Sequence, residues 1–159
     1  MKAAKLIVYC DGASRGNPGL ASAGICIQDD QGATVKEIGE VLGIATNNFA
    51  EYRALERALQ ECVLLNAKQV QVYTDSQLLT RQFNGQYKVK HPDCIESLGR
   101  IKLLCLKIGS VKVDHILRSS HKGNVRADAL ANIALDKQKQ QNAKPAGPQP
   151  KTFVQDRFL

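Results

Sequence analysis

The 159-residue chain has no tryptophan and one methionine, and aromatic side chains make up only 5% of it. It also lacks any apolar stretch near the roughly 20 residues that a membrane-spanning helix needs, so we expect no membrane association. The apolar run near the N-terminus is short and leads directly into an Asp-Gly loop. We therefore expect a first strand there rather than a secretory signal.

Cysteine is present but shows neither of its usual patterns. The five cysteines are odd in number, form no C-x-x-C pair and lie mostly in apolar segments. A zinc site and a disulfide framework are therefore not expected. Buried, reduced thiols are typical of a cytoplasmic protein, which is the location that we expect.

The charge is one-sided, although no block of Lys or Arg stands out. Lys and Arg number 22 against 15 Asp and Glu, which gives a formal net charge of +7 and a pI near 9.3. Such an excess favours a polyanionic partner, because the summed field concentrates anions at the surface. The hydrophobic fraction of 43% and the length suit a single domain with a real core.

Hydrophobic periodicity predicts an α/β domain. Alternating patterns predict strands, and three- and four-residue steps predict helices. The expected strands are 5–10, 20–28, 33–44, 69–73 and 111–117, and the expected helices are 47–67, 76–83, 92–108 and 125–137. Asn47 or Asn48 is expected to cap the first helix, and Asn124 the last. Short loops join the first three strands into an antiparallel meander, and crossover helices make the later strands parallel, which gives a mixed sheet with helices on its faces.

The composition changes near Gln138, which divides the chain into an expected domain, 1–138, and a tail, 139–159. The tail begins polar and rich in proline, as a flexible linker does. It ends with "TFVQDRFL", which carries three apolar anchors. This end either packs on its own domain, is disordered, or docks on a protein partner.

Four acidic residues lie where expected elements meet loops: Asp11, Glu51, Asp75 and Asp128. Asp11 and Asp75 end strands that can be parallel neighbours, which would bring them to the same edge of the sheet. Glu51 and Asp128 are expected in the first turns of two helices. Taken singly, each has an ordinary explanation as a turn residue or as a favourable charge at a helix N-terminus.

Taken together, the four acids favour a metal site. Four carboxylates at one place repel one another unless a cation is present. Oxygen ligands of this kind suit Mg²⁺ or Mn²⁺. Two such ions about 3.5–4 Å apart form the clamp that is used for in-line phosphoryl displacement.

Four segments together resemble the type 1 ribonuclease H family. They are "DGASRGNPG", "TNNFAEYRAL", "YTDSQLLTRQFNG" and "SHKGNVRADALANIAL", and the resemblance covers roughly residues 5–138 in matching order and spacing. It implies a ribonuclease H-like fold, a five-stranded mixed sheet of order 3-2-1-4-5 flanked by helices. It also implies an endonuclease that hydrolyses the RNA strand of RNA–DNA hybrids with two metal ions, leaving 5′-phosphate and 3′-hydroxyl ends.

The resemblance also implies roles for single residues. Asp11 would bridge two Mg²⁺ ions, with Glu51 and Asp75 on one ion and Asp128 on the other, and Mn²⁺ would be an alternative metal. The expected contacts with the hybrid, all by neutral groups that suit 2′-hydroxyls, base edges and phosphates, come from Gly16, Asn17, Thr46, Asn48 and Gln77.

The chain departs from many bacterial members in two places. The segment "NGQYKVKHPD" connects two helices almost directly, so the basic protrusion of those members is absent and Lys88 and Lys90 become candidates for gripping the substrate. The histidine that assists catalysis in the well-known bacterial form, ten residues before the last aspartate, is replaced by Arg118. His121, seven residues before Asp128, is the candidate for moving a proton or helping product release.

The leading interpretation is a monomeric, hybrid-specific endoribonuclease. A nuclease of the same fold that also cuts double-stranded RNA is the alternative among enzymes. A catalytically silent binding module is the alternative from another class, and the presence of all four carboxylates speaks against it. Transposase- and resolvase-like nucleases share the broad fold but differ in these loop motifs.

Overall fold

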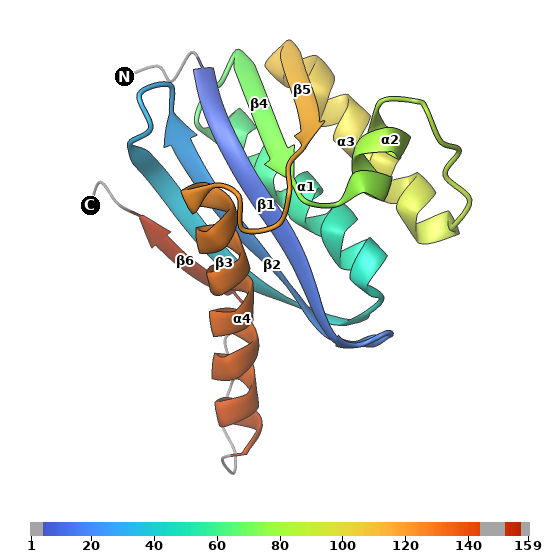
Figure 1. The fold of residues 1–159 in the computed structure, drawn as a ribbon, viewed down its shortest axis with the longest axis vertical. Coiled ribbons are helices and arrows are strands. Elements are labelled where there is room, and N and C mark those ends of the chain that lie inside the picture. The colour runs from blue at the N-terminus through green and yellow to red at the C-terminus, as the bar shows by residue number, and fades with distance from the viewer. Residues whose placement is uncertain (1–4, 144–151, 157–159) are drawn as a thin grey trace.

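A twisted mixed sheet with helices on both faces forms the protein in the computed structural model, which describes residues 5–143 and the backbone of residues 152–156 (Figure 1). The strands are β1 (Lys5–Gly16), β2 (Gly19–Asp29), β3 (Thr34–Ala45), β4 (Gln69–Thr74), β5 (Ser110–His115) and β6 (Thr152–Asp156). The helices are α1 (Asn47–Leu64), α2 (Gln77–Phe83), α3 (Pro92–Ile108) and α4 (Lys122–Asn142). Across the described residues, no helix combines the length and apolarity needed to cross a bilayer.

The first five strands have the expected order, and a sixth was not foreseen. The sheet runs β5-β4-β1-β2-β3-β6, with β1, β2 and β3 antiparallel and β4 and β5 parallel to β1. The last strand, β6, pairs antiparallel with β3, from Lys36 opposite Asp156 to Glu40 opposite Thr152. Residues 152–156 of the tail thus extend the sheet beside β3, while the expected linker, 144–151, and the last residues, 157–159, lie outside the described residues.

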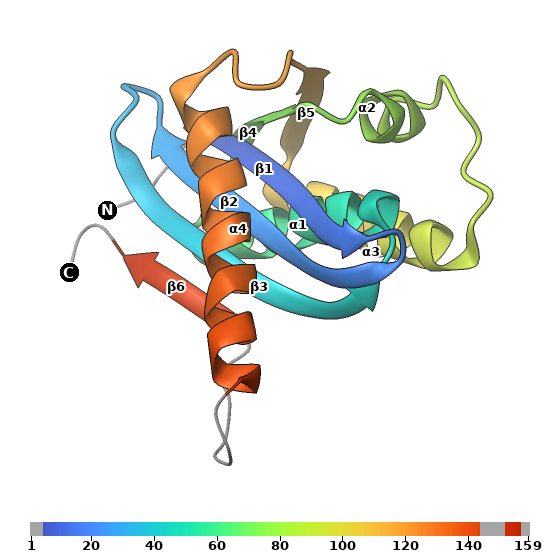
Figure 2. The ribbon, with the colours of Figure 1, turned by 60° about the horizontal axis from the view of Figure 1, so that its bottom comes forward.

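Successive side chains of β1 point to opposite faces of the sheet and so belong to two different clusters of buried residues. Val8 and Cys10 belong to the large core between the sheet and α1, whereas Tyr9 belongs to a smaller cluster with Ala127 of α4. Figure 2 shows α4 crossing the face of the sheet opposite to α1. This period of two explains how one strand supports a helix layer on each side.

The first strand is longer than expected, and Asp11 does not end it. Pairing with β2 continues to Gly16 opposite Gly19, so the predicted loop is the end of a hairpin. Pairing with β4 stops earlier, at Tyr9 opposite Tyr73. Asp11 thus lies inside a strand, two residues beyond the point where that strand loses one neighbour.

The helix starts also differ from the expectation. Thr46 caps α1, because its Oγ1 accepts a hydrogen bond from the Phe49 backbone 3.1 Å away, so neither Asn47 nor Asn48 is the cap. The last helix begins at Lys122, and Asn124 lies within it. Glu51 and Asp128 are consequently the fifth and seventh residues of their helices, past the first turn where the sequence suggested them.

Other boundaries shift by a few residues. The first helix ends at Leu64 rather than 67, and β5 ends at His115 rather than 117. The last helix continues to Asn142 and so crosses the expected domain boundary at 138. Lys and Gln are good helix formers, which explains why the helix extends into the polar segment.

Gly24 sets the distance between α4 and the sheet. A Cβ atom at Gly24 would lie 1.8 Å from the backbone oxygen of Ala127, which immediately precedes Asp128. We expect Gly24→Ala to push α4 outward and to lower the free energy of unfolding by about 1–3 kcal/mol, measured by urea denaturation.

The matched control for this prediction is Gly99→Ala. Gly99 lies inside α3, and a Cβ atom there would have no neighbour within 4 Å. We expect this variant to gain about 0.5–1 kcal/mol through helix propensity. Equal unfolding curves for the two variants would contradict the proposed role of Gly24.

Candidate active site

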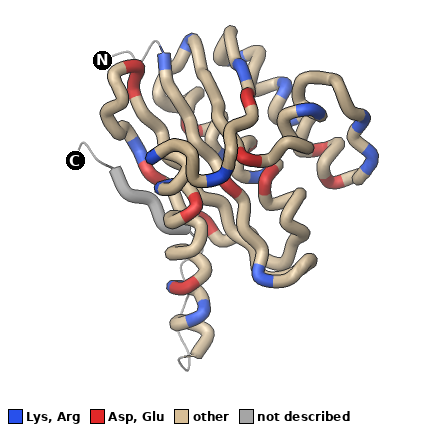
Figure 3. The backbone as a smooth tube through the Cα atoms, viewed as in Figure 1, with Lys and Arg blue, Asp and Glu red and all other residues tan. Residues whose placement is uncertain are grey.

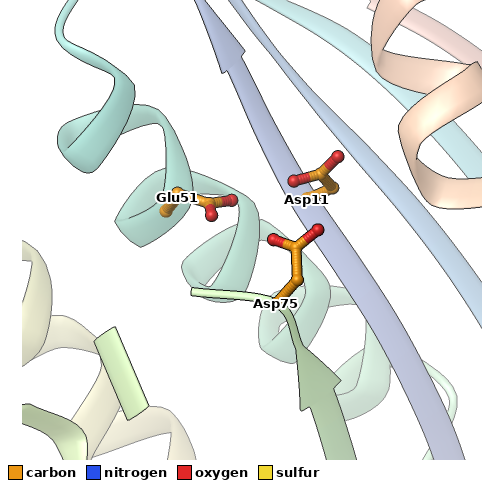
Figure 4. Close-up of side chains that lie close together, drawn as sticks. All are labelled: Asp11, Glu51 and Asp75. Carbon is orange, nitrogen blue, oxygen red and sulfur yellow. The ribbon is translucent and has the colours of Figure 1, made fainter. Parts of the chain in front are cut away.

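Three of the four predicted carboxylates meet beside the point where β4 leaves β1. Asp11 comes from the middle of β1, Asp75 follows the end of β4, and Glu51 extends from α1. One oxygen atom of each lies within 4.8 Å of the others. Figure 4 shows these side chains pointing toward one another.

Glycine at position 12 lets α1 come this close. A Cβ atom there would lie 2.4 Å from the backbone carbon of Ala50 and from the backbone nitrogen of Glu51. The Gly12 N–H also donates a hydrogen bond to Oε1 of Glu51. The strand therefore both admits the helix and orients its carboxylate toward Asp11.

The fourth carboxylate, Asp128, lies beside Asp11 but outside the tight group. Its proximity contributes to raising the pKa of the Asp11 carboxyl group, and both residues line the same cleft. Arg118 Nη2 lies 3.5 Å from Asp128 Oδ1, and Asn132 Nδ2 lies 3.5 Å from the same oxygen. Asp128 thus stands on the α4 side of the site, held between a cation and an amide.

Crowding changes the protonation of these acids. Burial, followed by the charge of Asp75 and the hydrogen bond with Asp128, raises the pKa of Asp11 from 3.8 to about 8. Burial and the charge of Asp11 also raise the pKa of Glu51 well above its usual value. Burial, followed by the charges of Glu51, Asp11 and Asp75, raises the pKa of the Cys10 thiol, so Cys10 stays neutral beneath the site. These shifts express the cost of placing like charges together in a poorly solvated place.

The chemistry of the donor set fits a hard divalent cation. All three groups offer carboxylate oxygens, and within the described residues they form the one such cluster of three or more His, Cys, Asp or Glu side chains. Magnesium and manganese prefer such oxygen ligands, whereas zinc favours nitrogen and sulfur. A cation would also remove the repulsion that raises the pKa values.

A cleft of about 290 Å³ opens over the carboxylates. Its lining consists of the four acids and a set of polar and small residues: Gly12, Ala13, Ser14, Arg15, Asn47, Arg118 and Asn132. Figure 3 shows the acidic segments lying close together near the middle of the fold, with basic segments in the connection between α2 and α3.

The predicted substrate residues lie around the hairpin end and the start of α1. Asn17 Oδ1 accepts a hydrogen bond from the Asn47 backbone, 3.0 Å away, so the hairpin is tied to a residue that lines the cleft. Gly16 has a φ of 117°, which side-chain-bearing residues rarely adopt. Thr46 directly precedes Asn47 as the cap, and Asn48 Nδ2 lies 3.8 Å from Cys94 Sγ.

Two further predicted residues lie at helix starts. Gln77 is the first residue of α2, two positions after Asp75, and is exposed. His121 immediately precedes α4, also exposed, and is not among the residues that line the cleft. Its ring stacks on Tyr73, with 5.8 Å between the ring centroids.

Sequence reasoning missed several residues of the cleft. Arg15 Nη2 lies 2.6 Å from Asp136 Oδ1 and 3.5 Å from Asn132 Oδ1, which links the end of β1 to α4. Asn132 also donates a hydrogen bond to the backbone oxygen of Asp128, 3.0 Å away. The four-residue spacing from Asp128 to Asn132 on one helix face was the signal available for Asn132.

Comparison with known proteins identifies the family of this chain. The family described as "Reverse transcriptase-like" matches residues 9–134. Ribonuclease HI of Halobacterium salinarum is 40% identical over 128 residues, which are 80% of this chain and 63% of that protein. The crystal structure of LC11-RNase H1 in complex with RNA/DNA hybrid matches with a TM-score of 0.79 and 40% identity, and the match covers 84% of this chain and 99% of that one. The chain belongs to the type 1 ribonuclease H family.

Family members differ in length. A bifunctional protein of Mycobacterium tuberculosis is 37% identical over 145 residues, which are 91% of this chain but 39% of that protein. The chain therefore spans less than two thirds of the length of either curated relative. In this family member, residues 84–91 alone join α2 to α3.

The raised pKa of Asp11 predicts a pH dependence of stability for the metal-free protein. The folded chain binds this proton more tightly than the unfolded chain, since the pKa moves from 3.8 to about 8. From roughly pH 4 to pH 8, stability therefore falls as pH rises. We expect Asp11→Asn to melt several degrees higher than the unsubstituted protein at pH 7, given that about 1 kcal/mol shifts a domain of this size by 2–4 °C.

The control is Asp30→Asn, which alters an exposed aspartate in the turn after β2. It should leave both the melting temperature and its dependence on pH unchanged. Thermal melts in chelator between pH 4 and pH 8 make the comparison. If the melting temperature of Asp11→Asn fell equally steeply as pH rises, the Asp11 carboxyl group would not be the source of the pH dependence.

Proposed function

We propose that this chain is an endoribonuclease that hydrolyses the RNA strand of RNA–DNA hybrids and leaves 5′-phosphate and 3′-hydroxyl ends. The observation that carries the proposal is the meeting of Asp11, Glu51 and Asp75, with Asp128 beside them, under an open cleft. The similar protein LC11-RNase H1, whose structure was solved in complex with an RNA/DNA hybrid, supports this choice of substrate.

Two Mg²⁺ ions, with Mn²⁺ as an alternative, are the cofactors that we propose. Asp11, Glu51, Asp75 and Asp128 would hold them, and the bound ions would supply the charge that activates water and stabilises the leaving oxygen. One carboxylate lies in β1, one directly follows β4 and two lie in helices, so the ligands are held in position before substrate arrives. Such preorganisation lets binding energy go into positioning the phosphate.

The neutral residues near the cleft suit a nucleic acid with 2′-hydroxyl groups. Asn17 uses its Oδ1 to hold Asn47, so its recognition of substrate would use the Nδ2 amino group. The Oγ1 of Thr46 accepts the cap hydrogen bond, and its O–H remains the donor for a phosphate oxygen. Gly16, Asn48 and Gln77 complete the proposed contacts with the hybrid.

We further propose a monomeric, cytoplasmic enzyme whose catalytic unit is residues 1–138. The tail, 139–159, would dock on this unit, and the pairing of β6 with β3 supports that choice over a partner protein. Double-stranded RNA remains the alternative substrate, since the connection between α2 and α3 is short.

Cleavage of one labelled sequence tests the proposal. It would be presented as RNA–DNA hybrid, duplex RNA, duplex DNA and single-stranded RNA, with Mg²⁺, Mn²⁺ or chelator. We expect metal-dependent cutting of the RNA strand in the hybrid. Loss of one metal ligand should cost more than about 100-fold, because even an outer partner of a ligand typically costs 10–100-fold.

Asp11→Asn serves as the inactive variant, and Asp30→Asn serves as the control that retains activity. Comparable cutting of duplex RNA would place the enzyme in a relaxed subgroup. Tight binding of the hybrid without cutting of any substrate would refute the nuclease function and would indicate a binding module.

Salt dependence tests how the chain holds its substrate. A ribonuclease H that carries a basic protrusion should bind the same hybrid more tightly than this chain, and its affinity should fall more steeply with salt, because the protrusion adds phosphate contacts. The slope of log affinity against log salt should be shallower for this chain by about 0.9 for each phosphate contact that it lacks. Equal affinities and equal slopes in parallel titrations would reject the prediction.

A further inference from the structure

The segment between β5 and α4 carries Arg118 to the cleft. Arg118 lines the cleft, and its Nη2 lies 3.5 Å from Asp128 Oδ1. The Arg118 side chain is 75% exposed, so packing around the guanidinium does not fix its position. The backbone of residues 117–120 must therefore determine where Arg118 points.

A buried residue anchors the beginning of this segment. Ile116 packs with Tyr9 and Ala127 in the cluster between the sheet and α4. The Ile116 N–H donates a 2.9 Å hydrogen bond to the backbone oxygen of Thr74, at the end of β4. Ile116 thus fixes the start of the segment beside Thr74, the residue that immediately precedes Asp75.

A stack of three rings anchors its other end. The His121 ring lies nearly parallel to the Tyr73 ring, at an interplanar angle of 14° and a centroid distance of 5.8 Å. Tyr73 in turn stacks on Tyr9, with 5.4 Å between centroids. Gly123 packs directly on Tyr9, since a Cβ atom there would lie 2.1 Å from the Tyr9 ring. The start of α4 thus rests on two tyrosines of adjacent parallel strands.

One amide ties the middle of the segment to the site. The Oδ1 of buried Asn124 accepts a 2.6 Å hydrogen bond from the Ser119 N–H. Ser119 has a φ of 61°, a conformation that needs such local support. Asn124 Nδ2 also lies 3.5 Å from Asp75 Oδ2. Only four residues separate the two anchors, so the ring stack constrains the backbone around Arg118 together with the Asn124 amide and the hydrogen bond from the Ser120 N–H to the Leu117 backbone oxygen.

We propose that His121 is a positioning residue, whose ring holds residues 117–120 on Tyr73 and thereby keeps Arg118 at the cleft beside Asp128. This inference rests on the proposed nuclease function. The guanidinium is a permanent cation that suits substrate phosphate, so its placement affects the reaction. His121 acts here through the shape of an aromatic ring, whereas the role suggested by the sequence, proton transfer, requires a titratable nitrogen.

The test compares five variants of the full chain with the unsubstituted protein. His121→Ala removes the ring, and His121→Phe keeps a ring without a titratable nitrogen. Arg118→Ala removes the guanidinium, and a double variant combines it with His121→Ala. His115→Ala, which alters an exposed histidine of β5, is the matched control.

Hybrid cleavage gives the first readout. We expect His121→Ala to lower kcat on the order of tenfold, within the roughly 100-fold that a misplaced group can cost. His121→Phe should stay within about twofold of the unsubstituted protein and keep the shape of its pH profile, because no proton passes through position 121. Adding His121→Ala to Arg118→Ala should change kcat no further, since the ring acts through Arg118.

Limited trypsin digestion reads the loop without using activity. Mass spectrometry would follow cleavage after Arg118 in the folded protein. His121→Ala should speed this cleavage several-fold, whereas His121→Phe and His115→Ala should leave it unchanged. Melting temperatures of all variants, taken in parallel, separate local loosening from global unfolding.

Three results would overturn the proposal. If His121→Phe is as slow as His121→Ala and loses one limb of the pH profile, His121 transfers a proton. If the two losses add in the double variant, His121 does not act through Arg118. If His121→Ala cleaves at full rate and resists trypsin as well as the unsubstituted protein, the stack positions nothing. Failure of the unsubstituted protein to cut the hybrid would instead refute the nuclease function, and the trypsin comparison would still report on the loop.

Discussion

Repulsion among the carboxyl groups of Asp11, Glu51 and Asp75 constrains the structure around them. One oxygen atom of each lies within 4.8 Å of the others, and burial, together with the charge of Asp75, raises the pKa of Asp11 to about 8. A chain that needed only stability would separate such groups, because burying like charges costs free energy. The fold instead holds them together from three elements, as a site that binds divalent cations requires, and this arrangement gives the proposed nuclease its chemistry.

Close backbone approach is the means by which the fold holds the site together. Gly12 admits α1 to β1, Gly24 admits α4 to β2, and Gly123 lets the start of α4 rest on Tyr9. A Cβ atom would prevent each of these contacts, so glycine residues allow the two helices that carry Glu51 and Asp128 to take their positions. The aromatic stack and Asn124 extend this rigidity to the segment that carries Arg118.

Much of this could be predicted from the sequence, because periodicity and the order of elements report directly on the sheet. The crossover pattern allowed β1 and β4 to be parallel neighbours, and the family resemblance implied that order. Their pairing brings Asp11 and Asp75 together as expected. The sequence could not show that β1 continues past Asp11, since that depends on a strand partner on one side alone. It also suggested Asn124 as a helix cap, whereas the structure places Asn124 inside α4, where its amide accepts the Ser119 N–H and lies 3.5 Å from Asp75 Oδ2. The strand β6 was missed because its pairing depends on the exposed edge of β3, which local pattern does not reveal.

Anomalous diffraction from crystals of the protein soaked in Mn²⁺ tests the central claim most directly. Scattering at a wavelength chosen for manganese locates the ion without reference to any activity. The account predicts a peak within coordination distance of Asp11, Glu51 and Asp75, and its loss in Asp11→Asn. A fully soaked crystal with no peak at these carboxylates, or with an undiminished peak in the variant, would contradict the claim that the fold gathers them to bind a divalent cation.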